Sequence, residues 1–341
     1  MSRTLACLLA MMAVGGCSNG LSRESSSVTP IVTVPTQFAI AAVPIPKFKL
    51  TTLVRGFGWQ SLAANPLGKV YVIADRRIFQ IGSNSEMIHF SGSTHWRSVS
   101  DGGPTTALFM APQELAFGPD GMLYVSDTGN VRKVDTKGYV TTVAGTLIDE
   151  SRNTNSGLTN PSRITVRKDG TIYLLQGNEI KKVFSNGNVE TMPSNSHPDL
   201  TGIAFDSKRN TLYVSSVYQI FKVGPNGSLD LIAGKEGGAL GDPYADGKGK
   251  SVSFGHIRAI TVDEDGNLFT VEQNTSRVRM VSPTGQVTTV AGSGFGRGVR
   301  PSPDGPGLKA SLLEPKEIKA DKKGNLYIID ENGIRKLTRL N

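Results

Sequence analysis

Six short apolar segments of this 341-residue chain each begin at a pair of mostly polar residues, and these pairs carry the chemistry that the sequence offers. If the segments surround one axis, the pairs meet in a ring of three basic groups, two carboxylates and amides. Such a ring can hydrogen-bond a sugar, a peptide or an anionic group, or its members can satisfy one another around ordered water. The candidate binding residues are Gln60, Gln113, Glu114, Arg163, Arg258, Lys316 and Glu317.

A repeated phrase positions these pairs. It consists of a short apolar strand, a Gly turn, a strand of the type Leu-Tyr-Val, a polar turn, an apolar and basic strand, another Gly turn, and a strand of the type Val-Thr-Thr-Val-Ala-Gly. The phrase is clearest in Gln113 to Gly145 and in Arg258 to Gly292. Its aromatic residue recurs about every 40 to 60 residues, which is the length of a four-stranded propeller blade. The sequence therefore predicts an all-β, six-bladed β-propeller over residues 47–341.

The last repeat is incomplete, because no strand of the type Val-Thr-Thr-Val-Ala-Gly follows Leu340. A segment of the missing type stands at the start of the repeat region, in Phe48 to Gly56. We predict that this N-terminal segment forms the outer strand of the sixth blade. Closing the ring in this way leaves no long unpaired sheet edge.

The first residues have the order of an export signal. Arg3 precedes the apolar run Leu5 to Val14, which is too short to span a membrane. The sequence Val-Gly-Gly-Cys that ends at Cys17 resembles the lipobox of bacterial lipoproteins, and the serine after it resembles the outer-membrane sorting pattern. The resemblance implies a signal peptide at residues 1–16 and acylation of Cys17, for example with palmitate; ordinary cleavage would leave the thiol free. Residues 17–46, polar and then interrupted by prolines, are interpreted as a flexible tether.

Cysteine content and charge exclude several functions. Cys7 lies in the signal segment, so a processed and lipidated chain holds no thiol for disulfides, thiolate metal sites or nucleophilic catalysis. The formal net charge of +8 favours anionic headgroups, acidic glycans or polyanions as contacts of an exported protein. The export signal argues against a nucleic-acid partner.

The repeated phrase also resembles the NHL repeat. Pro112 to Val134 carries the pattern best, and the connector Ala291 to Pro315 has the Ala-Gly, Asp-Gly and Ala-x-x-x-Pro elements of the family. The resemblance covers Lys47 to Leu340 and implies a propeller fold. It does not determine the chemistry, because the family includes RNA-binding, protein-binding and sensor propellers as well as lyase and lactonase relatives.

Those enzyme relatives imply which ligands a metal would need. The lyases hold zinc with three histidines, but of the four histidines here only His256, and less clearly His197, precede a first strand. The lactonases hold calcium with Glu, Asn and Asp, and the three basic groups of the ring would oppose a cation. The stretch Asp242 to Gly247 resembles a calcium loop only superficially, since Ser253 stands where a bidentate Glu belongs. We predict no metal and no cofactor.

Basic residues recur in the third strands of the repeats. They either form a polyanion-binding belt or are solvated charges on outer strands, and we favour the second interpretation. These residues are Arg132, Lys133, Lys181, Lys182, Lys222, Arg279, Arg335 and Lys336.

The function that these observations favour is a non-enzymatic propeller lipoprotein of the bacterial cell envelope that binds or scaffolds an envelope protein or a glycan. We expect a monomer that is attached through its lipid, most simply to the outer membrane. The alternative is a lyase- or lactonase-type enzyme with its site at the channel mouth.

Overall fold

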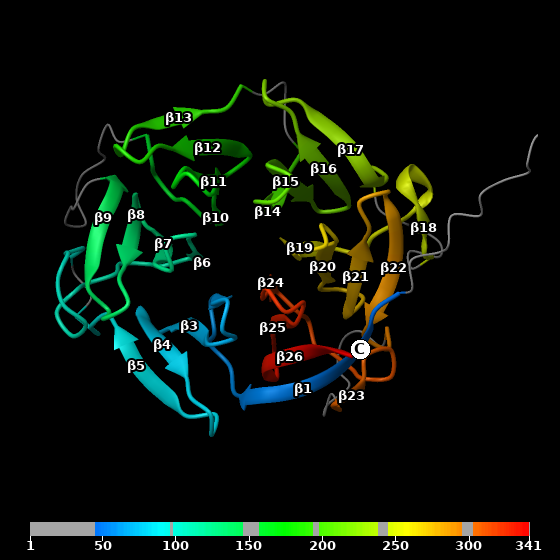
Figure 1. Cartoon of the computed structure of the whole chain (residues 1–341), viewed down its shortest axis with the longest axis horizontal. Coiled ribbons are helices and arrows are strands. Elements are labelled where there is room, and N and C mark those ends of the chain that lie inside the picture. Colours follow the sequence, from blue (N-terminus) through cyan, green and yellow to red (C-terminus); the bar gives the residue numbers. More distant parts are fainter. Residues whose placement is uncertain are drawn as a thin grey trace, which may run out of the picture. The chain divides into compact units, whose positions relative to one another are not determined.

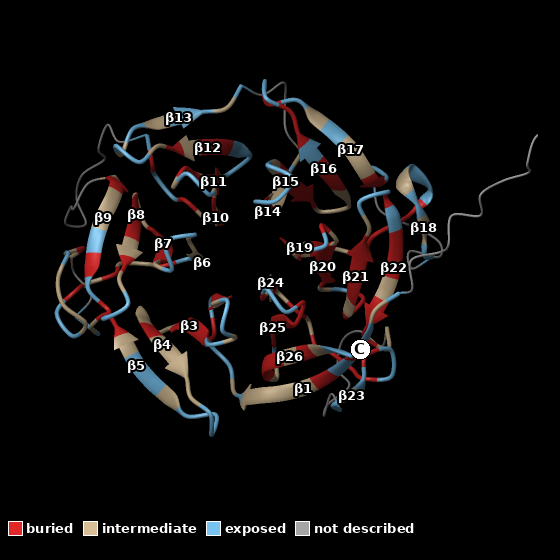
Figure 2. Cartoon of the chain, viewed as in Figure 1, coloured by how far each residue is buried: buried red, intermediate tan, exposed pale blue. Residues whose placement is uncertain are grey.

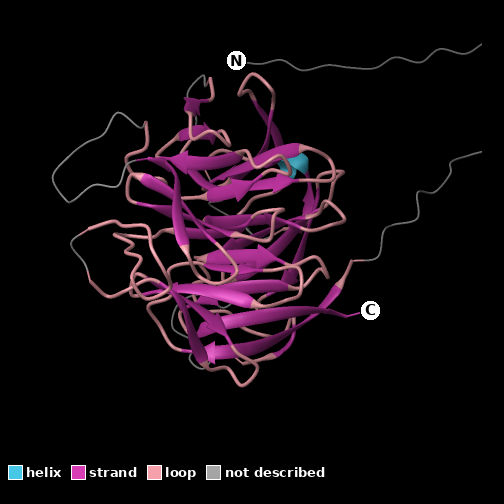
Figure 3. Cartoon of the chain, turned by 60° about the vertical axis from the view of Figure 1, so that its left-hand side comes forward, coloured by secondary structure: helices cyan, strands magenta, loops and turns pink. Residues whose placement is uncertain are grey.

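A computed structural model describes residues 45–95, 98–145, 157–193, 198–237, 245–294 and 303–340. Within these residues the chain forms six antiparallel sheets that follow one another around a ring (Figure 1). The only helical element of the described part is the 3₁₀ turn η1 (Gly249–Ser251), which Figure 3 shows beside the strands. The fold is thus the all-β, six-bladed propeller that the repeat predicts. The predicted signal peptide, Cys17 and nearly all of the predicted tether lie outside the described residues.

Each blade is a sheet of four principal strands. Blade 1 consists of β2 (Leu62–Ala64), β3 (Val70–Ala74), β4 (Arg77–Ile81) and β5 (Met87–Ser91). Blade 2 consists of β6 (Glu114–Phe117), β7 (Leu123–Asp127), β8 (Asn130–Val134) and β9 (Val140–Gly145). Blade 3 consists of β10 (Ile164–Val166), β11 (Ile172–Gln176), β12 (Glu179–Val183) and β13 (Val189–Thr191). Blade 4 consists of β14 (Leu200–Asp206), β15 (Thr211–Ser216), β16 (Gln219–Val223) and β17 (Leu229–Gly234). Blade 5 consists of β19 (Ile257–Val262), β20 (Leu268–Glu272), β21 (Arg277–Val281) and β22 (Gln286–Ala291). Blade 6 consists of β24 (Glu317–Ala320), β25 (Leu326–Asp330), β26 (Gly333–Leu340) and β1 (Lys47–Arg55).

Strand β1 closes the ring, as predicted. It pairs antiparallel with β26, with Leu50 opposite Leu337, so the first described strand completes the sheet that the last three strands begin. Two short strands extend the outer edges of blades 5 and 6: β18 (Gly247–Lys248) pairs with β22, and β23 (Gly305–Pro306) pairs with β1. These connectors therefore cover the outer edges of two blades.

The core lies between neighbouring sheets rather than within one of them. One cluster combines Phe48 and Leu50 of β1 and Leu337 of β26 with Phe269 and Val271 of β20 in the neighbouring blade. Figure 2 shows the buried parts of these strands in red. Since the middle strands are covered on both faces, every residue of β7 and of β25 is buried. Burial on both faces explains why these strands are nearly continuous apolar runs in the sequence.

No helix in the described part of the chain has the length and apolar character needed to cross a membrane.

Three third-strand arginines are buried ion-pair partners, so both interpretations of the third-strand basic residues are wrong for them. Arg335 donates to Asp330 at the end of β25 (2.7 Å) and to Asp304 in the connector before blade 6 (2.8 Å). Asp304 also accepts hydrogen bonds from the backbone N–H and the hydroxyl of Thr52 on β1. One carboxylate thus fastens the connector to both the third and the outer strand of the blade.

The same arrangement recurs in two other blades. Arg132 pairs with Asp127 and with connector residue Asp101, and Arg279 pairs with Glu272 and with connector residue Asp246. The side chains of all three arginines have no exposed surface. Asp246, at the end of the stretch that superficially resembles a calcium loop, therefore has a structural partner.

Candidate functional site

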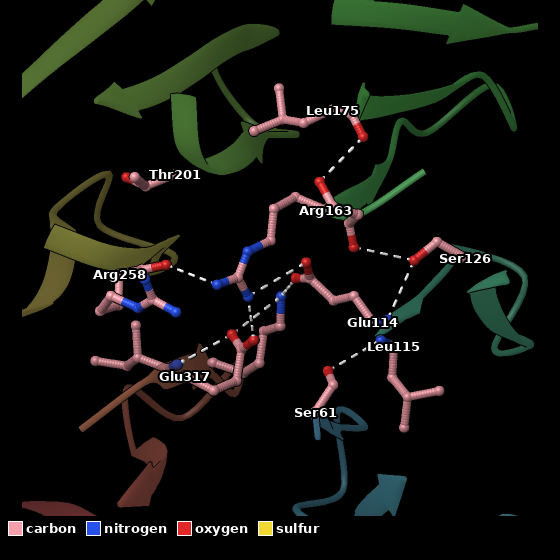
Figure 4. Close-up of polar contacts among 12 residues, drawn as sticks. Ser61, Glu114, Leu115, Ser126, Arg163, Leu175, Thr201, Arg258 and Glu317 are labelled. Atoms are coloured by element: carbon pink, nitrogen blue, oxygen red, sulfur yellow. Dashed lines mark hydrogen bonds and ion pairs between the residues drawn. The ribbon is translucent and has the colours of Figure 1, made fainter. Parts of the chain in front are cut away.

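Four charged side chains from three blades meet on the channel axis (Figure 4). Glu114 begins β6, Arg163 precedes β10, and Glu317 begins β24. Both carboxylates are buried, with 2% and 1% of their surface exposed. Arg163 Nη1 lies 2.5 Å from Glu317 Oε2 and 3.6 Å from Glu114 Oε2, and Lys319 Nζ contacts Glu114 Oε1 and lies 3.6 Å from Glu317 Oε1. We call Glu114, Arg163, Glu317 and Lys319 the channel cluster.

The channel cluster is electrically balanced, with two carboxylates and two cations. Burial raises the pKa of Glu114, and the opposing cation of Lys319 does not fully cancel that effect. Burial alone would lower the pKa of Lys319, but the two carboxylates outweigh burial and raise it. Arg163 also donates to the backbone oxygen of Arg258 (2.7 Å), which extends the cluster to blade 5. The cluster therefore crosslinks four blades, and its carboxylates are already paired.

Lys319 is the member of the cluster that sequence reasoning missed. It lies two residues after Glu317 on the same strand, and side chains at that spacing point to the same face of a strand. The strand period could have identified it once Glu317 had been placed in the channel.

The other predicted site residues lie nearer to solvent than the cluster. Gln60 and Gln113 are exposed, and Gln113 donates to the backbone oxygen of Ala111 (3.1 Å). Arg258 and Lys316 are half-buried, and neither side chain has a polar partner among the described residues. The structure thus joins three of the seven predicted residues in one cluster and leaves four separate from it.

His256 precedes β19, two residues before Arg258. Burial lowers the pKa of its imidazole, and the charge of Arg258 lowers it further. Burial likewise lowers the pKa of Arg258, with a contribution from Arg163, and burial lowers the pKa of Lys316. This end of blades 5 and 6 therefore gathers three partly desolvated basic groups, which we call the basic mouth (His256, Arg258 and Lys316); Glu317 opposes the effect of burial on Arg258, and Glu331 and Glu317 oppose it on Lys316.

A cavity of about 740 Å³ lies at the opposite ends of the first strands. Turns between first and second strands form its rim, at Pro66, Pro119, Lys168 and Lys322, and Lys319 of the channel cluster also lines it. Sequence reasoning placed the candidate site only at the starts of the first strands, so it did not anticipate this cavity.

The described part of the channel does not group the donors that zinc or calcium would need. Among the described residues no three His, Cys, Asp or Glu side chains are grouped so that they could hold a metal ion. His89 contacts the backbone oxygen of Gly92, and His95 contacts the hydroxyl of Ser93. His197 lies outside the described residues. The two channel carboxylates are paired with cations, so the residues present do not fit the ligand sets of the enzyme relatives.

Comparison of the sequence with known proteins gives distant relatives. No protein-family model matches the chain. Teneurin-3 of Mus musculus is 26% identical over an alignment 317 residues long that covers 76% of this chain and 11% of the teneurin. The protein SUPPRESSOR OF QUENCHING 1, chloroplastic, of Arabidopsis thaliana is 26% identical over an alignment 298 residues long that covers 75% of this chain and 26% of that protein. The chain spans about a tenth of the length of the teneurins it matches.

Comparison of the structure gives neighbours with the same fold. An auxiliary nutrient binding protein from Bacteroides thetaiotaomicron has a TM-score of 0.62 at 15% identity, over 88% of this chain and 78% of that one. A gluconolactonase from Xanthomonas campestris has a TM-score of 0.57 at 15% identity, over 88% and 96%. A streptogramin B lyase has a TM-score of 0.55 at 13% identity, over 86% and 98%. At these identities the likeness shows the fold alone.

Proposed function

We propose that this protein is a lipid-anchored binding module of the bacterial cell envelope, with an NHL-type propeller that recognises an envelope protein or a glycan at the basic mouth and the neighbouring amides. In this proposal residues 1–16 are the signal peptide, Cys17 carries the lipid, residues 17–46 are the tether, and residues 47–341 are the propeller. The anchor rests on the resemblance of the first residues to a lipobox. The protein acts as a monomer at the outer membrane.

The observation that carries a binding function is the pairing within the channel cluster. Glu114 and Glu317 are the carboxylates best placed to hold a catalytic cation, and Arg163 and Lys319 already neutralise them. Freeing either carboxylate would leave a buried charge without its partner, which typically costs ~3–5 kcal/mol. The channel cluster therefore stays paired within the protein. The side chains of Gln60, Gln113 and the basic mouth are the groups that are available to bind a ligand.

The structural neighbours include both a nutrient-binding protein and enzymes, so the fold supports either class equally. The channel cluster favours a binding protein over a metal-dependent enzyme. A metal-dependent lyase or lactonase needs free metal ligands in the channel, and the carboxylates of this channel are held in internal ion pairs. A nutrient-binding neighbour from a bacterium is consistent with the proposed role in an envelope.

Affinity capture tests the proposed function. The propeller, residues 47–341, is immobilised and exposed to detergent-solubilised envelope and to a glycan array. We expect a ligand whose capture is lost in Gln60→Ala/Gln113→Ala and kept in Lys322→Ala, a surface change at the opposite mouth. Metal analysis after dialysis against a chelator is the counter-test: one equivalent of retained zinc or calcium, with turnover of a lactone, would overturn the proposal.

A further inference from the structure

The cations on the first strands outnumber the carboxylates that face them. Arg163 and Lys319 are paired with Glu114 and Glu317 in the channel cluster. Arg258 and Lys316 have no ion-pair or hydrogen-bond partner for their side chains among the described residues, and Arg258 Nε is buried without an acceptor. The first-strand region of the described part thus carries two cations that no carboxylate contacts directly, although Glu331 and Glu317 lie close enough to Lys316 to act on its charge.

These two cations belong to neighbouring strands. Arg258 is the second residue of β19, and Lys316 directly precedes β24, which lies beside β19 in the ring. The backbone holds both positions: Lys316 N–H donates to the oxygen of Ile329 (2.9 Å), and the oxygen of Arg258 accepts from Arg163. The backbone positions from which the two side chains extend are therefore set by the sheet and the channel cluster.

Leaving half-buried cations unpaired is unfavourable, because desolvation weakens their hydration and like charges repel. Burial is the main reason that the pKa of Lys316 is lowered; Glu331 and Glu317 oppose that effect only in part, and Arg258 adds to it. His256 meets the same two influences, burial and Arg258. A bound anion would pair with these groups and relieve the repulsion.

The groups around the basic mouth indicate what carries the anion. Gln60 and Gln113 present exposed amides, which both donate and accept hydrogen bonds as sugar hydroxyls do. Phe57 is 91% exposed, and the residue before it, Gly56, donates to the backbone oxygen of Asn332 in the β25–β26 turn of blade 6. The exposed ring of Phe57 lies three residues before Gln60 in the chain, and with the amides and cations at the starts of the first strands it offers the kinds of group that bind a sugar ring bearing a carboxylate.

We propose that Arg258 and Lys316 form an anion subsite and that the ligand of this mouth is a glycan that carries carboxylates, such as a chain of uronic acids. This inference rests on the proposed binding function and specifies its ligand class. Each carboxylate pairs with the guanidinium or the ammonium, the amides bind hydroxyls, and Phe57 packs on a sugar face. Such charge-assisted hydrogen bonds are about twice as strong as neutral ones, so both affinity and selectivity depend on the two cations.

The test uses the full chain in detergent and a fluorescently labelled oligogalacturonate, with neutral oligogalactose of equal length as competitor. We expect the acidic oligosaccharide to bind at least ~10-fold more tightly than the neutral one, and Arg258→Gln or Lys316→Gln each to weaken it by ~10-fold or more. Lys322→Gln and Lys168→Gln remove the same charge at the opposite mouth and should change affinity less than ~2-fold. Melting curves confirm that each variant is folded.

Four results would overturn the inference. One is the absence of oligogalacturonate binding, or equal affinity for both sugars. Another is an equal loss in the Lys322→Gln control, which would mean that net charge alone attracts the glycan. The third is tighter binding of a poly-glutamate peptide than of oligogalacturonate at equal charge, which would assign the mouth to acidic proteins. Capture of an envelope ligand that Arg258→Gln and Lys316→Gln leave unchanged would also refute the anion subsite, while the proposed binding function would stand.

Discussion

Removal of β1 should open blade 6, because this strand supplies both the outer edge of the sheet and part of its core. Phe48 and Leu50 are 4% and 0% exposed, and the ring of Phe48 packs edge-on against Phe269 at 6.0 Å between centroids. At ~1.5–3 kcal/mol for each buried side chain, these two residues together contribute about 3–6 kcal/mol. Leu53 and Val54 are only half-buried and add less. The loss approaches the ~5–15 kcal/mol net stability of a typical domain.

Two chains that differ only in where they start, one of them with β1 and the other without it, test this reasoning. A chain starting at Lys47 should melt cooperatively, whereas one starting at Phe57 should melt at a much lower temperature or bind a hydrophobic dye. Within the full strand, Leu50→Ala should lower the free energy of unfolding by ~2–5 kcal/mol in urea titrations, because it leaves a cavity in the core.

Lys49→Ala is the matched control, since this exposed neighbour should change stability by less than ~0.5 kcal/mol. Equal melting temperatures for the two chains would refute the closing role of β1, because the blade would then close by some other route.

Three further predictions concern the connectors and the N-terminus. Asp304→Ala should destabilise the propeller by ~1–3 kcal/mol in urea, because it removes one partner of the buried Arg335 while Asp330 and solvent compensate part of the loss; an unchanged midpoint would contradict this. Burial alone would raise the pKa of Asp304, but hydrogen bonds from Arg335 and Thr52 lower it overall. Its contribution to stability is therefore present above pH ~4 and is lost on further acidification. The urea concentration at the unfolding midpoint should therefore fall less between pH ~5 and pH ~3 in Asp304→Asn than in the unchanged protein. Cys17→Ser should leave the propeller folded but release it from the membrane, and a variant that still fractionates wholly with membranes would exclude the lipid anchor.

The fold was predictable because its signals are local. Each hairpin turn between first and second strands needs a residue at positive φ, and Gly121 and Gly324 adopt φ of 76° there. The closing strand was predictable for the same reason, since the type of strand missing after Leu340 stands at Phe48 to Gly56. These features repeat from blade to blade, so a repeat whose own sequence is degenerate can still be assigned by comparison with the clearer repeats.

The arginine pairs were not predicted, because their partners are distant in sequence. Arg335 and Asp304 are separated by a whole connector and two strands, and the alternation of the third strand alone does not show that a connector covers its charged face. A usable signal existed. In each of the three blades an Asp-Gly step precedes the first strand and an acidic residue ends the second strand, whereas blade 3 lacks both and has Lys181 at the equivalent position.

The channel ring shows how far residue types alone can lead. Alignment of the first strands gave its members but not their pairing, and the choice between a ligand-binding ring and a self-satisfied channel depended on that pairing. The structure divides the ring between the two interpretations: Glu114, Arg163 and Glu317, with Lys319, satisfy one another, while Arg258 and Lys316 do not. Because the paired half holds both carboxylates of the ring in place, an external anion is the simplest way to neutralise the unpaired half. The internal ion pairs that disfavour a catalytic metal are therefore also the basis on which we propose an acidic ligand for the basic mouth.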